Sequence, residues 1–177
     1  MAADIGRAPH QATVAYTGAP ASPAEEAGRL VDGQAYAWRL SLAAARKELG
    51  GFEALSFIEE GAGPGGEHGI IAARPQIAGD VILARKGLGV AYHLAAVVDD
   101  ADQGVSHVIR GADLFEATHI QRLLQALLGL PTPIYRHHRL LRGPDGKRLA
   151  KRNGAQSLRE LRAAGVSAET LRERLGF

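Results

Sequence analysis

The chain has 177 residues, of which 46% are hydrophobic, 23% charged and 5% aromatic, so it can form one substantial soluble domain, or one domain and a small appendage. Its net charge of +2 excludes a protein coated with cations. It contains no cysteine, which excludes disulfides and thiolate metal sites and is compatible with a reducing cytoplasm.

The N-terminal third is expected to begin with irregular structure and to continue with strands. Residues 1–33 are rich in Ala, Gly and Pro, but Ser22 and Glu25 have the spacing of a capping box and predict a short helix. Alternating apolar residues predict a strand at 35–42, and a second strand is expected at 52–58.

The glycine-rich run 61–66 is interpreted as a flexible surface loop. A phosphate-binding loop needs a helix directly after its glycines, and no helical pattern follows this run. The glycines within 86–89 instead predict the turn of a hairpin between strands at 80–85 and 90–98. A further short, β-branched strand is expected at 105–109.

The clearest helix is predicted next. Thr118 and Gln121 have the spacing of a capping box, and Gly129 is suited to the C-terminal cap. The apolar stripe of this helix consists of Ile120, Leu123, Leu124, Leu127 and Leu128.

The C-terminal part is expected to hold a strand at 134–141 and two short helices that begin at Ser157 and Ser167. Strands that alternate with helices favour an α/β fold. The N-terminal third does not supply the strand, loop and helix that open a complete nucleotide-binding sheet. No apolar run approaches the ~20 residues that span a bilayer, and the N-terminus lacks a signal-peptide pattern, so we expect a cytoplasmic protein that does not bind membranes.

A basic loop at 143–154 is the most informative motif. Seven Lys and Arg lie between Ile134 and Arg152 against the single acid Asp145, which creates a local positive field suited to phosphate. A solvated hairpin tip would have the same composition. Small neighbours around Lys151 would let its ammonium approach a phosphate closely, and a mobile lysine can stabilise charge on an α-phosphate.

Arg110 and Tyr92 are candidate binding residues upstream of the loop. Arg110 follows a predicted strand and precedes Gly111, a position suited to bidentate binding of a carboxylate, although a surface ion pair with Asp113 or Asp100 would explain it equally well. Tyr92 fits a core or hairpin position, or a pocket in which its hydroxyl binds an amino group or a carboxylate.

Two other polar clusters are candidate metal sites. Asp99, Asp100 and Asp102 are better explained by helix capping and by pairing with nearby arginines. His137 and His138 are adjacent, so a strand points them to opposite faces and argues against joint metal ligation. The other histidines are assigned no chemistry.

Taken in order, these motifs resemble the class I aminoacyl-tRNA synthetases of the glutamyl type. The resemblance is carried by the block 92–114, by 128–133, and by residues 148–152, which occupy the place of the family's KMSKS signature. Within this family the match is closer to the shortened glutamyl-queuosine tRNA(Asp) synthetases than to full glutamyl-tRNA synthetases, because the chain stops at Phe177 and contains the phrase 110–114.

The resemblance implies a ligase that activates L-glutamate with ATP, as its Mg²⁺ complex, and transfers it to queuosine of tRNA(Asp). Tyr92 and Arg110 fall where the family binds glutamate, and Lys151 falls on the catalytic, ATP-contacting lysine of the signature. The ATP-binding loop would consist of Arg148, Leu149, Ala150, Lys151 and Arg152, with Ala150 in place of the family's serine.

The resemblance also implies a fold: a partial class I Rossmann-type catalytic domain with an inserted β-rich segment. The parallel sheet would lack its N-terminal strand–helix half, because no HIGH signature occurs in residues 1–30. We expect 34–177 to be the C-terminal part of the catalytic domain and 1–33 to be a remnant of the inserted region. The family's zinc site falls near 16–20, where no cysteine stands, so no zinc is expected.

Two other functions remain open at this stage. The chain could be a non-catalytic module that binds tRNA or phosphate through residues 134–152, or a fragment of a glutamyl-tRNA synthetase. With the HIGH half missing, we expect impaired activity from these residues alone.

Overall fold

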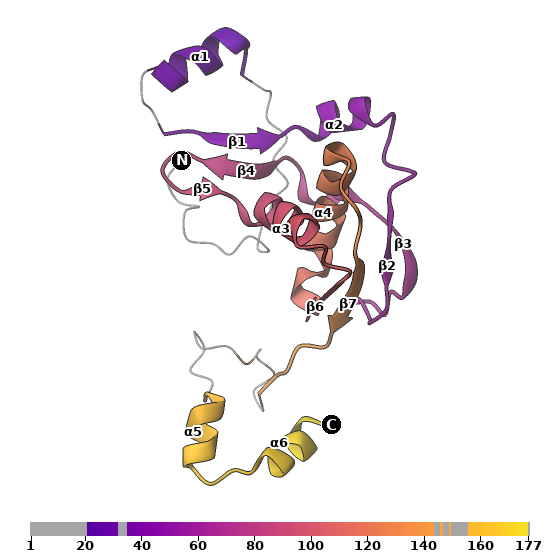
Figure 1. Ribbon diagram of the computed structural model, residues 1–177, viewed down its shortest axis with the longest axis vertical. Coiled ribbons are helices and arrows are strands. Elements are labelled where there is room, and N and C mark those ends of the chain that lie inside the picture. The colour runs from indigo at the N-terminus through magenta and orange to yellow at the C-terminus, as the bar shows by residue number, and fades with distance from the viewer. Residues whose placement is uncertain (1–20, 32–34, 144–145, 147–148, 150–155, 177) are drawn as a thin grey trace. The chain divides into compact units, whose positions relative to one another are not determined.

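The computed structural model describes residues 21–31, 35–143, 146, 149 and 156–176. The chain divides into two compact units, Met1–His138 and Arg139–Phe177, and each is described by itself (Figure 1). Residues 1–20 and 32–34 lie outside the described ones, so the expected boundary between 1–33 and 34–177 stays a prediction.

The first unit contains two sheets. An antiparallel sheet has the strand order β1-β4-β5, and a mixed sheet has the order β3-β2-β7-β6. In the mixed sheet β2 pairs with β3 antiparallel, whereas β2 with β7 and β6 with β7 are parallel. The strands are β1 (Ala37–Leu40), β2 (Ser56–Glu59), β3 (Gly69–Ala72), β4 (Val81–Arg85), β5 (Gly89–Val90), β6 (His107–Gly111) and β7 (Ile134–His138).

Helix α4 (Phe115–Leu128) lies between the two sheets and organises the core. Phe115 and Leu123 pack with Phe57 and Tyr135 of the mixed sheet. On its other side α4 packs through Ile120 against the antiparallel sheet. The other helical elements of this unit are α1 (Pro23–Val31), α2 (Leu42–Glu48), α3 (Tyr92–Asp102) and the 3-10 turns η1 (Pro75–Ala78) and η2 (Ala112–Leu114).

This architecture confirms the predicted α/β fold and corresponds to part of a Rossmann-like domain. Parallel pairing requires long crossovers, and here β6 is joined to its parallel neighbour β7 through α4. The glycine run 61–66 is a loop followed by β3, which agrees with the prediction that it opens no helix.

The prediction of a strand at 90–98 was wrong. Only Gly89–Val90 is a strand, and Tyr92–Asp102 forms α3. Leu94, Val97 and Ala101 recur at helical spacing, and Val97 is buried against α4. The valines and the tyrosine favour a strand locally, but packing of an apolar helical face outweighs that preference.

Several predicted boundaries also shift. The strand expected at 35–42 ends at Leu40, because Ser41 caps α2 with its hydroxyl. The strand expected at 52–58 begins only at Ser56, and the one expected at 134–141 ends at His138. Thr118 does not cap α4: the helix begins at Phe115, and Thr118 is fully buried inside it.

The described residues of the second unit include two short helices, α5 (Leu158–Ala163) and α6 (Ala168–Leu175). Ser157 and Glu160 form the complete capping box that the sequence predicts, and Ser167 accepts from the Thr170 N–H at the start of α6. Gly165, between the helices, has the positive φ of 81° that favours glycine. These predictions are confirmed.

Candidate functional site

Arg110 is the centre of a polar network on the mixed sheet. From β6 its Nη2 donates to the Thr118 hydroxyl at 2.6 Å, and its Nε donates to His137 Nε2 at 3.1 Å. The guanidinium lies over the Tyr135 ring, 5.2 Å from its centroid. Contacts from α4 and β7 therefore hold the Arg110 side chain in one orientation.

Tyr92 meets the same arginine from a different element. It is the first residue of α3, and its side chain is 38% exposed. Its hydroxyl accepts a hydrogen bond from Arg110 Nη1 at 3.4 Å. The alternative of a core or hairpin tyrosine is wrong, because this side chain is exposed and belongs to a helix. The structure thus brings together the two residues for which the sequence predicts a shared ligand.

Arg110 also lies in the field of an acid. Asp100, near the end of α3, has a pKa raised mainly by burial, and the positive charge of Arg110 opposes that rise. The expected roles of Asp99 and Asp100 as helix caps are wrong, because both stand in the C-terminal half of α3 rather than at a helix start. The nearby charge of Asp100 partly offsets that of Arg110.

Glu59 and His137 form a buried pair beneath Arg110. Glu59 is 0% exposed and ends β2, and its Oε2 lies 2.5 Å from His137 Nδ1. Its Oε1 accepts the backbone N–H groups of His137 and Gly61, each at 2.8 Å. With donors on both oxygens, the carboxylate has the partners that a buried acid requires.

The contacts of His137 define its protonation. Its Nε2 accepts from Arg110, so the ring proton sits on Nδ1 and is donated to Glu59. Burial lowers the pKa of His137 and Arg110 lowers it further, whereas the hydrogen bond to Glu59 raises it. A neutral imidazole therefore connects the buried carboxylate to the guanidinium.

Aromatic and amide side chains surround this network. Tyr135 is 1% exposed, and Gln125 Nε2 donates to its hydroxyl at 2.9 Å. Burial raises the pKa of Tyr135. His119 packs edge-on against Phe115 and accepts the Arg74 backbone N–H, while burial and the charge of Arg74 lower its pKa to about 4.

Sequence reasoning missed Glu59, His137 and Thr118 as parts of this network. The prediction that His137 and His138 point to opposite faces of a strand agrees with the structure, in which His137 is buried and His138 is exposed. The alternation along β7 was thus available as a signal that one histidine faces inward. Its partner Glu59 lies 78 residues earlier, and no local pattern connects the two.

Most of the predicted ATP-binding loop lies outside the described residues, namely Arg148, Ala150, Lys151 and Arg152. Leu149 is described: it is 46% exposed, and its backbone N–H donates to the Leu141 carbonyl at 2.9 Å. The role of Lys151 therefore stays a prediction.

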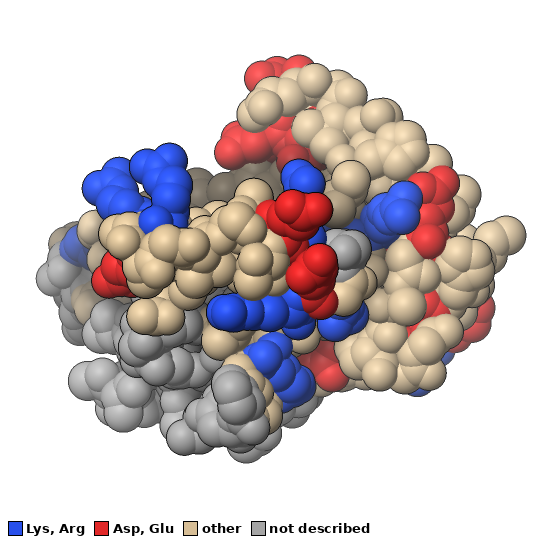
Figure 2. Space-filling model, turned by 90° about the horizontal axis from the view of Figure 1, so that it is seen from below, with Lys and Arg blue, Asp and Glu red and all other residues tan. Residues whose placement is uncertain are grey.

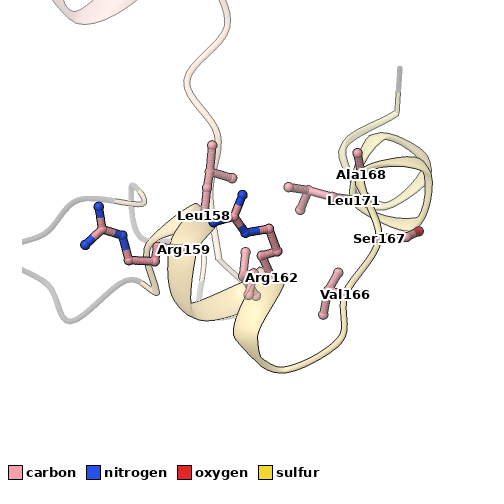
Figure 3. Close-up of a pocket in the computed structure, with 8 residues that line it drawn as sticks. Leu158, Arg159, Arg162, Val166, Ser167, Ala168 and Leu171 are labelled. Carbon is pink, nitrogen blue, oxygen red and sulfur yellow. The ribbon is translucent and has the colours of Figure 1, made fainter.

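The second unit contains a hollow of about 350 Å³ between α5 and α6. Figure 3 shows Leu158 and Leu171 directed toward each other across it, with Arg159 pointing away. From Arg139 to Phe177 the sequence has ten Lys and Arg against four Asp and Glu, so the positive charge of the protein is concentrated there. On the face drawn in Figure 2, described basic and acidic side chains are interspersed.

The described residues contain neither a membrane-spanning helix nor a metal-binding cluster. Among them, no helix is both long and apolar enough to cross a membrane. No group of three His, Asp or Glu side chains in this part of the chain is arranged to hold a metal ion. The expectation that zinc is not needed stays a prediction.

The chain matches a known protein family. Residues 67–176 match the family described as tRNA synthetases class I (E and Q), catalytic domain. The chain belongs to this family of class I synthetases. The matched residues include Tyr92, Arg110 and His137, so most of the polar network lies in the synthetase catalytic domain.

Two curated relatives are similar to most of the chain. A glutamyl-Q tRNA(Asp) synthetase from Rhodobacter capsulatus is 44% identical over 94% of this chain and 62% of the relative. The corresponding protein from Symbiobacterium thermophilum is 40% identical over 98% of this chain and 51% of its own length. The chain thus spans about half to three-fifths of the length of these curated relatives.

The fold agrees with a solved synthetase. A glutamate tRNA ligase from Elizabethkingia meningosepticum, crystallised with its amino acid, superposes with a TM-score of 0.57 at 22% identity. The superposition covers 76% of this chain and 24% of the ligase. The predicted class I catalytic fold is confirmed.

Proposed function

We propose that this synthetase domain binds the glutamate that is activated by ATP and transferred to queuosine of tRNA(Asp). The observation that carries the proposal is the fixed Arg110 guanidinium beside the Tyr92 hydroxyl. His137 and Thr118 hold two of its nitrogens, and contacts among the described residues leave part of its fork of N–H donors for a ligand. Such a fork matches the geometry of a carboxylate.

Tyr92 suits the same ligand. Its oxygen lies at the long end of hydrogen-bonding distance from Arg110, and its O–H can donate to an acid oxygen that the guanidinium also holds. The exposed fraction of 38% leaves this edge open to a small molecule. The resemblance to the family assigns glutamate to the same two positions, which supports the choice of ligand.

The proposed reaction begins with adenylate formation. A glutamate carboxylate oxygen bonds to the α-phosphorus of ATP, the α–β phosphoanhydride breaks, and pyrophosphate leaves. ATP enters as its Mg²⁺ complex, and Lys151 would stabilise the charge on the α-phosphate. The glutamyl group then passes to queuosine, and AMP is released.

Glutamate binding tests the first step without requiring turnover. We expect titration by NMR or calorimetry to show L-glutamate binding that Arg110→Gln abolishes and Tyr92→Phe weakens by about tenfold, the effect of losing roughly one hydrogen bond to a charged group. Arg136→Gln, at an exposed position of β7, is the matched control. Equal binding by the wild type and Arg110→Gln would refute the assignment.

Exchange of labelled pyrophosphate into ATP tests the reaction. Glutamate-dependent exchange lost on Lys151→Ala would support the catalytic lysine, and tRNA(Asp) containing queuosine would then serve as the acceptor. Because the chain spans only part of its relatives, we expect weak exchange from these residues alone.

A second candidate function is binding of tRNA without catalysis. Residues 139–177 contain ten Lys and Arg against four Asp and Glu, which favours contact with phosphates. Such binding would weaken steeply with salt and would be indifferent to glutamate. Binding of tRNA that survives Arg110→Gln unchanged, in the absence of any glutamate binding, would favour this candidate.

A further inference from the structure

The antiparallel sheet, whose strands lie side by side in Figure 1, has one face turned away from the core. Leu83 of β4 packs toward Ile120 of α4, so its neighbour Ala84 points to the opposite side. Trp38 of β1 and Val90 of β5 are the direct partners of Ala84 and share its side. The three residues therefore form a row across the sheet, in which Trp38 is 42% exposed and Val90 is 58% exposed.

Tyr36 and Lys86 extend this surface beyond the ends of the strands. The Lys86 N–H donates to the Tyr36 carbonyl at 3.1 Å, which continues the pairing of β1 with β4. The ring centroids of Tyr36 and Trp38 are 5.8 Å apart in an edge-to-face arrangement, and Lys86 Nζ lies 5.9 Å from the centroid of the Tyr36 ring. We call the set Tyr36, Trp38, Ala84, Lys86 and Val90 the aromatic face.

The exposure of Trp38 distinguishes the aromatic face from the aromatic residues of the core. Phe57, Phe115 and Tyr135 are buried, because large rings gain most free energy from leaving water. Trp38 instead stays accessible with a second ring at its side. An exposed ring of this kind is a platform on which another planar group can stack. The aromatic face is thus suited to a nucleic-acid base.

The charges around the aromatic face favour a phosphate backbone. Residues 35–42 and 81–92 contain no Asp or Glu and three cations, namely Arg39, Arg85 and Lys86. Arg39 is the partner of Ile82, which alternates with Ala84, so Arg39 stands on the same side of the sheet as Lys86. The adjoining Asp80 accepts the Leu42 backbone N–H. Rings flanked by cations are the pattern that binds unpaired nucleotides, since bases stack on the rings while phosphates pair with the cations.

The aromatic face also adjoins the candidate glutamate site. Val90 and Tyr92 are two residues apart in the chain, so their Cα atoms are separated by at most about 7 Å. The Tyr92 hydroxyl in turn accepts from Arg110. A nucleotide strand on the aromatic face would therefore pass close to the edge at which glutamate is proposed to bind.

We propose that the aromatic face binds unpaired nucleotides of the RNA that accepts glutamate. One base stacks on Trp38, and Lys86 and Arg39 pair with the flanking phosphates. The choice of RNA rests on the proposed function, in which tRNA(Asp) is the acceptor. Paired nucleotides do not fit, because their bases are already stacked inside the helix. A protein partner is less favoured, since lysine is depleted in protein interfaces.

The fluorescence of Trp38 is the first readout, because this residue is the only tryptophan in the sequence. We expect single-stranded oligoadenylate and tRNA(Asp) to quench it, whereas oligoadenylate paired with oligouridylate should not. Equal quenching by the paired RNA would overturn the proposal, since no unpaired base would then be needed. Equal quenching by ATP at the same nucleotide concentration would also overturn it, because the face would then be a mononucleotide site.

Variants test the individual contacts through the anisotropy of dye-labelled oligoadenylate. Trp38→Leu should weaken binding about tenfold or more, the effect of losing one stacked base, and Trp38→Phe should recover most of the affinity. Lys86→Gln should weaken binding and reduce the salt dependence by about one released ion. Ile70→Ala, at an exposed position (80%) of β3 in the other sheet, is the control and should change binding less than about twofold.

The remaining outcomes separate this proposal from the proposed function. RNA binding that ignores Trp38→Leu would overturn the proposal and assign the RNA to the basic residues 139–177. A wild-type chain that binds L-glutamate but is quenched by neither RNA would refute the aromatic face alone. Quenching by RNA in a chain that does not bind glutamate would support the aromatic face and refute the proposed glutamate site.

Discussion

Glu59 Oε2 accepts a hydrogen bond from His137 Nδ1–H, with 2.5 Å between the two heavy atoms, and both side chains are completely buried. The pair joins β2 to β7 and sets the imidazole so that its other nitrogen faces Arg110. A buried acid therefore controls the orientation of an arginine that it does not touch.

Glu59→Gln should destabilise the protein by about 1 to 3 kcal/mol, the cost of leaving buried polar groups unpaired. The amide NH₂ would face either His137 Nδ1–H or the backbone N–H groups that Glu59 now accepts. Reversing the tautomer would place Nε2–H against Arg110 Nε–H. Urea unfolding measures the loss, and the exposed Glu60→Gln should stay within about 0.5 kcal/mol of the wild type.

Thr118→Val should also cost about 1 to 3 kcal/mol, although the shape of the side chain is conserved. The hydroxyl of Thr118 accepts from Arg110 Nη2 at 2.6 Å in a fully buried position. Thr118→Ser keeps this acceptor and loses one methyl group, which is worth about 0.8 kcal/mol. An equal loss of unfolding free energy in both variants would show that the hydroxyl contributes little.

Gly61→Ala should destabilise the first unit by about 2 kcal/mol or more, because the added methyl group overpacks the sheet. A Cβ at this position would lie 2.2 Å from the His137 carbonyl oxygen, so the backbone would have to move. The loop would then no longer offer the Gly61 N–H to Glu59. Gly28→Ala in α1 meets nothing within 4 Å and should be neutral or slightly stabilising in thermal unfolding.

Acidification should destabilise the protein through His119. Burial and Arg74 lower its pKa from 6.5 to about 4, so the unfolded chain binds more protons between these values. The free energy of unfolding should therefore fall as the pH is lowered through this window, by on the order of 3 kcal/mol, and level off below it. His137, whose pKa is also lowered, adds in the same direction.

The pH effect is checked with denaturant titrations at several pH values. His119→Gln can accept from the Arg74 N–H but does not titrate, so its stability should depend less steeply on pH than that of the wild type. His107→Gln, at an exposed position, should keep the wild-type slope. A slope that His119→Gln leaves unchanged would contradict the assignment.

The sequence by itself determined the features that depend on near neighbours. Ser22 with Glu25 and Ser157 with Glu160 form their capping boxes three residues apart, and Gly129 ends α4 in the left-handed conformation. The ordered motifs also indicated the family and the pairing of Tyr92 with Arg110. These signals are local, or lie within one continuous matched block, so they can be read along the chain.

Only the tertiary structure decided which groups support the candidate site. Residues 92–102 became helical because a face containing Val97 packs against α4, which outweighs the strand preference of their valines. Glu59 reached His137 because β2 pairs with β7 across 78 residues of chain. Burial then converted an ordinary acid and histidine into the fixed support of Arg110, since polar groups removed from water must satisfy one another.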